Sequence, residues 1–185
     1  MLRIAFMVSI FAFSLVGRNH AVDRRDTFFV RAAIFFALFA DLFLILNVNY
    51  EVYIVGIASF SICQLLHFIR YAGTKKFKEI AIAVPIVFYV FPADFDIVVK
   101  FSAVYIACFL LSAYGAAHAF KIKKYDGPNR HFIIAATLFF LISDVCVLLY
   151  NSRPLTNYQD VFLFLIWIFC LPAHILLSLS KIKLR

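Results

Sequence analysis

Long hydrophobic runs separated by short polar stretches follow one another along the whole chain. Seven such runs can be marked, at residues 2–17, 28–46, 52–72, 78–92, 97–119, 131–150 and 159–180. At 1.5 Å per residue, a helix needs about 20 apolar residues to cross the hydrocarbon core of a bilayer. The runs at 2–17 and 78–92 are at the lower limit of this length. The pattern predicts an all-α, polytopic membrane bundle of seven transmembrane helices in a single domain, residues 1–185.

The composition supports the membrane assignment. Hydrophobic residues make up 65% of the chain and charged residues 15%, whereas a soluble domain carries about 25% charged residues. The four cysteines all lie inside apolar runs without short spacings, which is typical of buried thiols and not of a disulfide framework or a zinc site. Phosphate-binding Gly-rich loops, His-Glu-x-x-His helices and Gly-x-Ser-x-Gly elbows are absent from the sequence, so we expect no cofactor and no metal.

Basic residues predict the orientation of the bundle. Fifteen of the 18 Lys and Arg residues follow the first, third and fifth runs or lie in the C-terminal tail, and the other three are Arg3, Lys100 and Arg153. Because cytoplasmic loops are rich in Lys and Arg, this split places the N-terminus outside and the C-terminus in the cytoplasm. A cleaved signal peptide over the first run would contradict the charge rule. Topology thus accounts for the net charge of +8, and no nucleic-acid partner is expected.

Two acids interrupt otherwise apolar runs. Asp41 lies as far beyond the start of the second run (28 to 41) as Asp144 lies beyond the start of the sixth (131 to 144). An ionised carboxylate in a membrane helix costs about 2.5–3.5 kcal/mol on insertion scales. Both runs lead from the cytoplasm outward in the predicted topology, so both acids should lie roughly 20 Å from the cytoplasmic end. We interpret them as functional residues that share one plane.

Further polar residues form stripes on the predicted helices. The third run carries Ser61, Gln64, His67 and Tyr71, and the seventh carries Trp167, Cys170, His174 and Ser178, all at steps of three or four. Such steps keep side chains on one helical face, which in a membrane turns inward. For His67 and His174, structural and functional roles remain equally open. Ser143 precedes Asp144, but neighbours on a helix point about 100° apart, so the two are not a nucleophile and its base.

At these residues the sequence resembles the YhhN family of membrane proteins, which includes the lysoplasmalogenases. The family pattern of a small residue before Asp corresponds to FALFADLFL, with Ala40 where Gly is usual. Its Gly, Phe, His, Tyr helix corresponds to Gly56, Phe60, His67 and Tyr71. Its Arg, small residues, Phe and Ser-Asp correspond to Arg130, Ala135, Ala136, Phe139, Ser143 and Asp144. The last helix departs from the family, because Ala173-His174 stands where Ala-Gln is common. The resemblance covers roughly residues 28–180.

The resemblance implies hydrolysis of the vinyl-ether bond of a lysoplasmalogen, or of another ether lipid, to a fatty aldehyde and a glycerophospho-base. Asp41 and Asp144 would be the acid and base, in either order. The positioning residues would be Gln64, His67, Tyr71, Tyr105, Arg130, Ser143 and His174. Three alternatives remain open: a proton-coupled transporter or channel that uses the same acids, a zinc-dependent lipid hydrolase, and an accessory protein without catalysis. The estimated depth of the histidines, roughly 10 Å from the acids, argues against one zinc sphere.

Overall fold

The computed structural model describes residues 2–15, 23–46, 49–73, 86, 90, 95–150 and 157–182. In these residues it contains six helices, namely α1 (Leu2–Leu15), α2 (Arg24–Leu46), α3 (Tyr50–Ala72), α5 (Ile97–Lys121), α6 (Gly127–Tyr150) and α7 (Gln159–Leu179). The predicted all-α class is therefore confirmed for the part of the chain described. The predicted helix at 78–92 lies outside the described residues, apart from Ile86 and Val90.

Five of these helices, α2, α3, α5, α6 and α7, are long and apolar enough to cross a membrane. The protein is accordingly an integral, multi-pass membrane protein, with five membrane-length helices among the described residues where the sequence predicts seven spans. The first predicted span, residues 2–17, is described only in part. Helix α1 covers Leu2–Leu15, and residues 16 and 17 lie outside the described residues.

Several helices extend beyond their apolar runs into polar sequence. Helix α2 begins at Arg24 and α6 at Gly127, each about one helical turn before the start predicted from hydrophobicity. Pro128, in the first turn of α6, suits this position because its missing N–H would have no helical partner there. The side chains of Asn49 and Asp96 cap α3 and α5 by accepting hydrogen bonds from Val52 N and Val98 N. These local bonds let the chain satisfy helix ends outside the apolar region.

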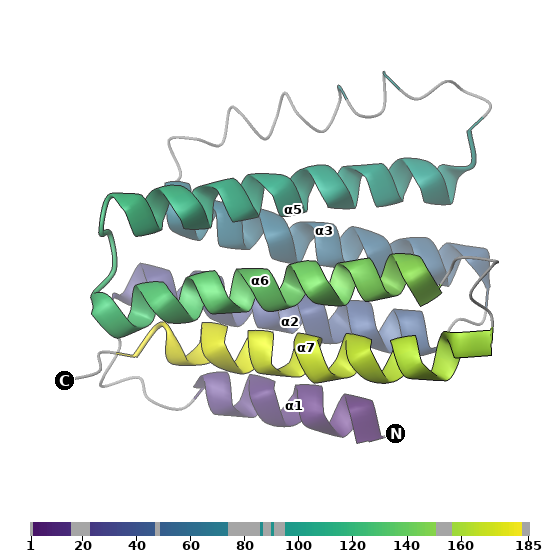
Figure 1. Ribbon diagram of the computed structural model, residues 1–185, viewed down its shortest axis with the longest axis horizontal. Helices are drawn as coiled ribbons and strands as arrows, with labels where there is room; N and C mark the ends of the chain where they lie inside the picture. The colour runs from purple at the N-terminus through teal and green to yellow at the C-terminus, as the bar shows by residue number, and fades with distance from the viewer. Residues whose placement is uncertain are drawn as a thin grey trace.

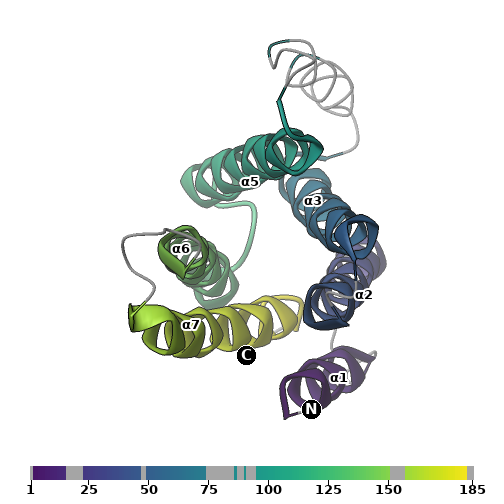
Figure 2. The ribbon, with the colours of Figure 1, turned by 90° about the vertical axis from the view of Figure 1, so that its right-hand side faces the viewer.

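The long helices lie side by side, and seen along their axes α2, α3, α5, α6 and α7 form a ring (Figures 1 and 2). Helix α3 packs extensively against both α2 and α5, and α6 packs against α7. Helix α1 lies outside the ring and contacts α2 and α7. Helices α2 and α6 run in the same direction, as predicted, and so do α3 and α5 (Figure 1). The end of the bundle that holds the C-terminus is called the inner end below.

The close contact of α2 with α3 requires a residue without a side chain at Gly56. A Cβ atom there would lie 2.8 Å from the side chain of Leu44 and 3.3 Å from the carbonyl oxygen of Ala40. A larger residue would therefore displace the Leu44 side chain and crowd the backbone of α2 at Ala40. Gly56 thus holds α3 against the segment of α2 that carries Asp41.

A buried ion pair between Asp26 of α2 and Arg70 of α3 joins the helices at the inner end. The Arg70 Nε and Nη2 atoms each donate to one carboxylate oxygen of Asp26 at 2.8 Å, and both side chains are buried. Tyr125, between α5 and α6, donates to Asp26 at 2.9 Å. Arg70 also donates to the Ser180 hydroxyl, just after α7, at 2.9 Å. Lys124 donates to the carbonyl oxygen of Arg70 at 2.8 Å. One network therefore holds parts of α2, α3, the α5–α6 connection and the end of α7.

A second set of contacts closes the C-terminal end of α1. Arg31 of α2 donates to the carbonyl oxygens of Ser14 and Leu15 at 2.9 and 2.8 Å. The buried Lys181 ammonium, just after α7, also donates to the carbonyl oxygen of Ser14. Burial, together with the nearby guanidinium groups of Arg31 and Arg70, lowers the pKa of Lys181 to about 8. Arg31 and Lys181, which the sequence analysis used only to predict orientation, thus also hold helix α1 against the bundle.

We predict that Asp26→Asn lowers the free energy of unfolding by about 3–5 kcal/mol, because it leaves the buried Arg70 guanidinium without its counter-charge. Thermal unfolding in detergent measures the effect. Asp126→Asn is the matched control, since Asp126 is exposed in the α5–α6 connection at the same end of the bundle; it should change stability by no more than about 0.5 kcal/mol. Equal effects of the two substitutions would contradict a structural role for the ion pair.

Candidate functional site

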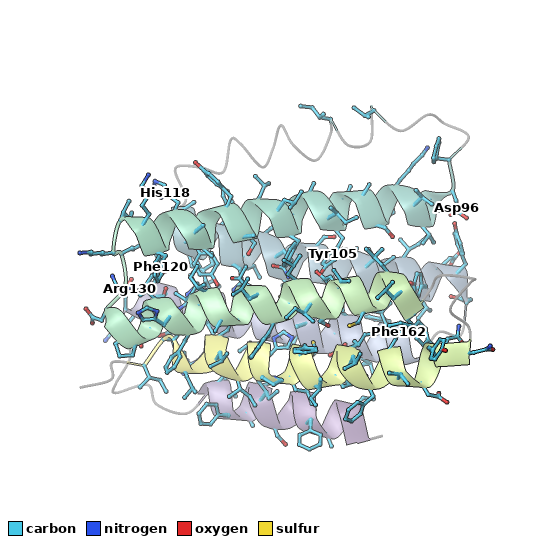
Figure 3. All side chains as sticks on the ribbon, viewed as in Figure 1. Asp96, Tyr105, His118, Phe120, Arg130 and Phe162 are labelled. Atoms are coloured by element: carbon cyan, nitrogen blue, oxygen red, sulfur yellow. The ribbon has the colours of Figure 1, made fainter. Side chains whose placement is uncertain are left out.

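Asp144 and Tyr105 connect α6 to α5 within the bundle. The Tyr105 hydroxyl lies 2.8 Å from each of the two carboxylate oxygens of Asp144. Tyr105 is on the side of α5 that faces α6 (Figure 3), and Asp144 is partly buried. A hydroxyl that donates to a carboxylate makes one of the stronger hydrogen bonds in proteins. This bond fixes the direction of the Asp144 side chain within the ring.

Asp41 is buried in α2, with 1% of its surface exposed. It interacts electrostatically with the Cys63 thiol of α3, and Cys63 in turn interacts with Tyr105. Both acids therefore belong to the same interior, connected through α3 and α5.

The two acids keep the equal register that the sequence predicts. The interval from 24 to 41 in α2 equals the interval from 127 to 144 in α6. Both helices begin earlier than their apolar runs, so each acid lies about 25 Å beyond the start of its helix. The depth of the acids in the membrane stays a prediction. Because the two helices are extended by the same amount, the acids still lie at matching positions.

A set of polar side chains from α3 and α7 lies farther toward the inner end. Gln64, His67 and Tyr71 of α3 and His174 of α7 are all buried, with 3% or less of their surface exposed. The ring of His67 stacks on that of Tyr71, with centroids 6.0 Å apart, and His174 meets Phe140 edge to face at 4.9 Å. The two imidazoles also interact electrostatically with each other. The structure therefore brings His67 of α3 and His174 of α7 together in the interior.

Each histidine lies one helical turn beyond a cysteine that interacts with Tyr105. His67 follows Cys63, and His174 follows Cys170, by four positions each, which is about 6 Å along a helix. Cys63 and Cys170 both interact electrostatically with Tyr105. The rough 10 Å separation between the histidines and the acids stays a prediction. Among the described residues, no group of three or more His, Cys, Asp or Glu side chains could hold a metal ion.

Ser143 contacts α7, and Arg130 contacts α5. The Ser143 hydroxyl donates to the carbonyl oxygen of Ile166 in α7 at 3.2 Å, so it joins α6 to α7. The Arg130 guanidinium lies over the Phe120 ring at 5.3 Å, at the inner end of the bundle (Figure 3). The interval from Arg130 to Asp144 corresponds to about 21 Å along α6.

Sequence reasoning missed the residues that support the site from the inner end, above all Asp26 and Arg70. One signal was available, because Arg70 follows His67 by three positions and so continues the polar stripe of α3. Its pairing with Asp26, 44 residues earlier, has no counterpart in local sequence.

Comparison with known proteins gives one match. The model of the YhhN family matches residues 1–181. The chain belongs to the YhhN family. No curated protein and no solved structure matches it.

The YhhN match is wider than the resemblance read from the motifs, which starts at residue 28. It includes α1, the helix that Arg31 and Lys181 fasten to the bundle. Three of the residues that carry the resemblance have a defined structural setting in this YhhN protein. Gly56 allows the contact between α2 and α3, His67 is buried in the interior, and Asp144 bonds to Tyr105.

We predict that Tyr105→Phe lowers the free energy of unfolding by about 1–3 kcal/mol, because the Asp144 carboxylate loses a hydrogen bond from a phenol within the bundle. Tyr114→Phe is the matched control, since Tyr114 lies on the same helix and is 60% exposed. It should change stability by less than about 0.5 kcal/mol. Thermal unfolding of both variants in the same detergent makes the comparison, and similar stability of the two would contradict the importance of the Tyr105–Asp144 bond.

Proposed function

We propose that this YhhN protein is a membrane-embedded hydrolase that cleaves the vinyl-ether bond of a lysoplasmalogen or a related ether lipid. The products are a fatty aldehyde and a glycerophospho-base. The observation that carries the proposal is the bond between Asp144 and Tyr105 in the same interior as the buried Asp41. Two carboxyl groups among apolar helices would supply the acid and the base that the reaction needs, without a cofactor.

The reaction requires an acid first and a base second. One carboxylic acid transfers its proton to the vinyl carbon farther from the ether oxygen, which gives an oxocarbenium ion. The other group, as carboxylate, stabilises this cation and takes a proton from the attacking water. The resulting hemiacetal then breaks down to the aldehyde and the alcohol. A pair of carboxyl groups in different environments suits these roles, since one can remain protonated while the other is ionised.

The basic residues of the inner end suit a lipid with an anionic head group. Arg130 lies at that end, with part of its surface exposed, and could attract the phosphate as the lipid enters. Gln64, His67, Tyr71, Tyr105 and His174 would then position the lipid and the water, and Ser143 would fix α6 against α7. The inner end corresponds to the cytoplasmic side in the seven-span topology that we propose from the basic residues.

We predict that Asp41→Asn and Asp144→Asn each abolish aldehyde release from a lysoplasmalogen by the purified protein, because an amide keeps the size of the acid but cannot transfer its proton. The double variant should lose little more than either single variant, since groups that act as a unit are non-additive. Asp160→Asn is the control, because Asp160 is exposed in the first turn of α7, and it should retain activity. Aldehyde release that survives Asp144→Asn would refute the paired-acid mechanism.

The same assay separates hydrolysis from proton-coupled transport. A transporter would release no aldehyde from any ether lipid, and its Asp→Asn variants would instead uncouple substrate flux from the proton gradient. A wild-type protein that is inert on every vinyl-ether lipid tested would therefore favour transport.

The proposed topology gives a separate prediction. Asp126 is exposed just before α6, and Asp160 is exposed in the first turn of α7. The starts of these two helices lie at opposite ends of the bundle (Figure 1), so single cysteines at the two positions should differ in their reaction with an impermeant thiol reagent on intact cells. The four native cysteines are buried and should give little background. We expect labelling of Asp160→Cys and protection of Asp126→Cys. Labelling of Asp126→Cys from outside would reverse the proposed orientation.

A further inference from the structure

Four side chains of α3 and α7 carry hydrogen-bonding atoms that have no partner among the described residues. They are the Gln64 amide nitrogen, both ring nitrogens of His67, both ring nitrogens of His174 and the Ser178 hydroxyl. Each of the four side chains is buried, with 2% or less of its surface exposed. The spacing of Gln64 with His67, and of His174 with Ser178, puts each pair on one face of its helix.

Unsatisfied groups of this kind are expensive to bury. Each buried donor or acceptor without a partner costs about 1–3 kcal/mol, and the great majority of buried polar groups in proteins are hydrogen-bonded. Lipid cannot supply the missing bonds from its hydrocarbon region. His67 of α3 and His174 of α7 interact electrostatically across the interior. Several unsatisfied atoms on these two helices therefore indicate a binding site whose occupant makes hydrogen bonds.

The chemistry of the four side chains selects the occupant. Imidazoles in a membrane interior are neutral by preference, because charge there is costly, and a neutral imidazole presents one donor and one acceptor. Its acceptor nitrogen needs an O–H or N–H donor, which a phosphate diester or a carboxylate lacks. The charge of the nearby Arg70 guanidinium is already balanced by Asp26, which accepts from its Nε and Nη2 atoms. Its Nη1 atom has no partner among the described residues, and a hydroxyl can accept from it as well as an anion can. A hydroxyl group can donate to an imidazole acceptor and accept from one or two of the donors, so it matches these side chains in kind.

The position of the site relative to the acids identifies which hydroxyl it suits. His67 and His174 lie about one helical turn, roughly 6 Å, beyond Cys63 and Cys170 toward the inner end. Both cysteines are in electrostatic contact with Tyr105, the partner of Asp144. An alcohol one or two carbons from a cleaved ether bond would reach across this separation, with the head group directed to the basic inner end.

We propose that Gln64, His67, His174 and Ser178 form a hydroxyl-binding site that recognises a free alcohol of the lipid next to the cleaved ether bond. The position assigned to that alcohol rests on the proposed function. The site would make these residues determinants of substrate specificity, because a lipid with an acylated or missing hydroxyl would leave the same polar atoms unsatisfied.

Binding of a lipid that cannot be hydrolysed tests the site independently of catalysis. The probes are a saturated 1-O-alkyl glycerophospholipid with a free 2-hydroxyl and its 2-deoxy analogue, titrated into the full-length protein in detergent. The wild type should bind the hydroxyl lipid about tenfold more tightly, which corresponds to about 1.4 kcal/mol. His174→Phe should bring the two affinities to within about twofold of each other.

Two controls separate recognition from a general loss of structure. His174→Gln keeps one donor and one acceptor, so it should retain most of the discrimination that His174→Phe loses. His118→Phe makes the same change at an exposed histidine of α5, and it should bind both lipids as the wild type does. If His174→Phe fails to fold, Gln64→Leu provides the same test from α3.

The outcomes for this site and for hydrolysis are distinct. Equal binding of the two lipids by the folded wild type would overturn the proposal and would indicate that ordered water fills the site. If the protein binds the hydroxyl lipid more tightly than the deoxy lipid but releases no aldehyde, the hydroxyl-binding site is supported and the proposed hydrolase activity is contradicted. The two affinities could also become equal in His174→Gln as they do in His174→Phe. This result would show that His174 does not act through hydrogen bonding, and it would overturn the proposal as well.

Discussion

The buried ion pair of Asp26 and Arg70 is the interaction on which the arrangement of the helices depends most. Its two hydrogen bonds join α2 to α3, and Tyr125 and Ser180 extend them to the α5–α6 connection and the end of α7. Burial raises the pKa of the Tyr125 phenol, so Tyr125 remains a neutral donor to the carboxylate. Because a buried charge without its partner is costly, the pair favours the one arrangement in which these segments meet. That arrangement directs the polar stripes of α3 and α7 into the ring.

Farther from the inner end than this network, the interior of the ring combines apolar walls with a small number of polar groups. Buried clusters such as Phe109, Ala136, Phe140, Cys170, Ala173 and Leu177 pack α5, α6 and α7 together. Against this background Asp144 has Tyr105, whereas His67 and His174 keep ring nitrogens without partners in the described residues. An enzyme that acts on a lipid needs this contrast, since the apolar part receives the chain and the polar groups act on the bond to be broken.

The sequence was sufficient to predict the fold class, because a membrane helix leaves a long hydrophobic run that no loop resembles. It also predicted the shared register of Asp41 and Asp144, which follows from their equal distance from the starts of parallel helices. Helix ends were less predictable, since polar residues such as Arg24 continue α2 beyond its apolar part. The contacts of Arg70 and Lys181 could not be predicted. The sequence does not distinguish a basic residue that binds another helix from one that only follows the excess of Lys and Arg in cytoplasmic loops. Their partners Asp26 and Ser14 are 44 and 167 residues away.

The central claim is that a carboxylic acid inside the bundle transfers a proton to a vinyl-ether carbon. Hydrolysis by the purified protein in D₂O tests this most directly, with the aldehyde trapped at once and analysed by mass spectrometry. The account predicts one deuterium on the carbon next to the aldehyde carbonyl, because that carbon receives its new hydrogen from an acid in exchange with solvent. An aldehyde without deuterium at that carbon, or no aldehyde at all, would contradict it.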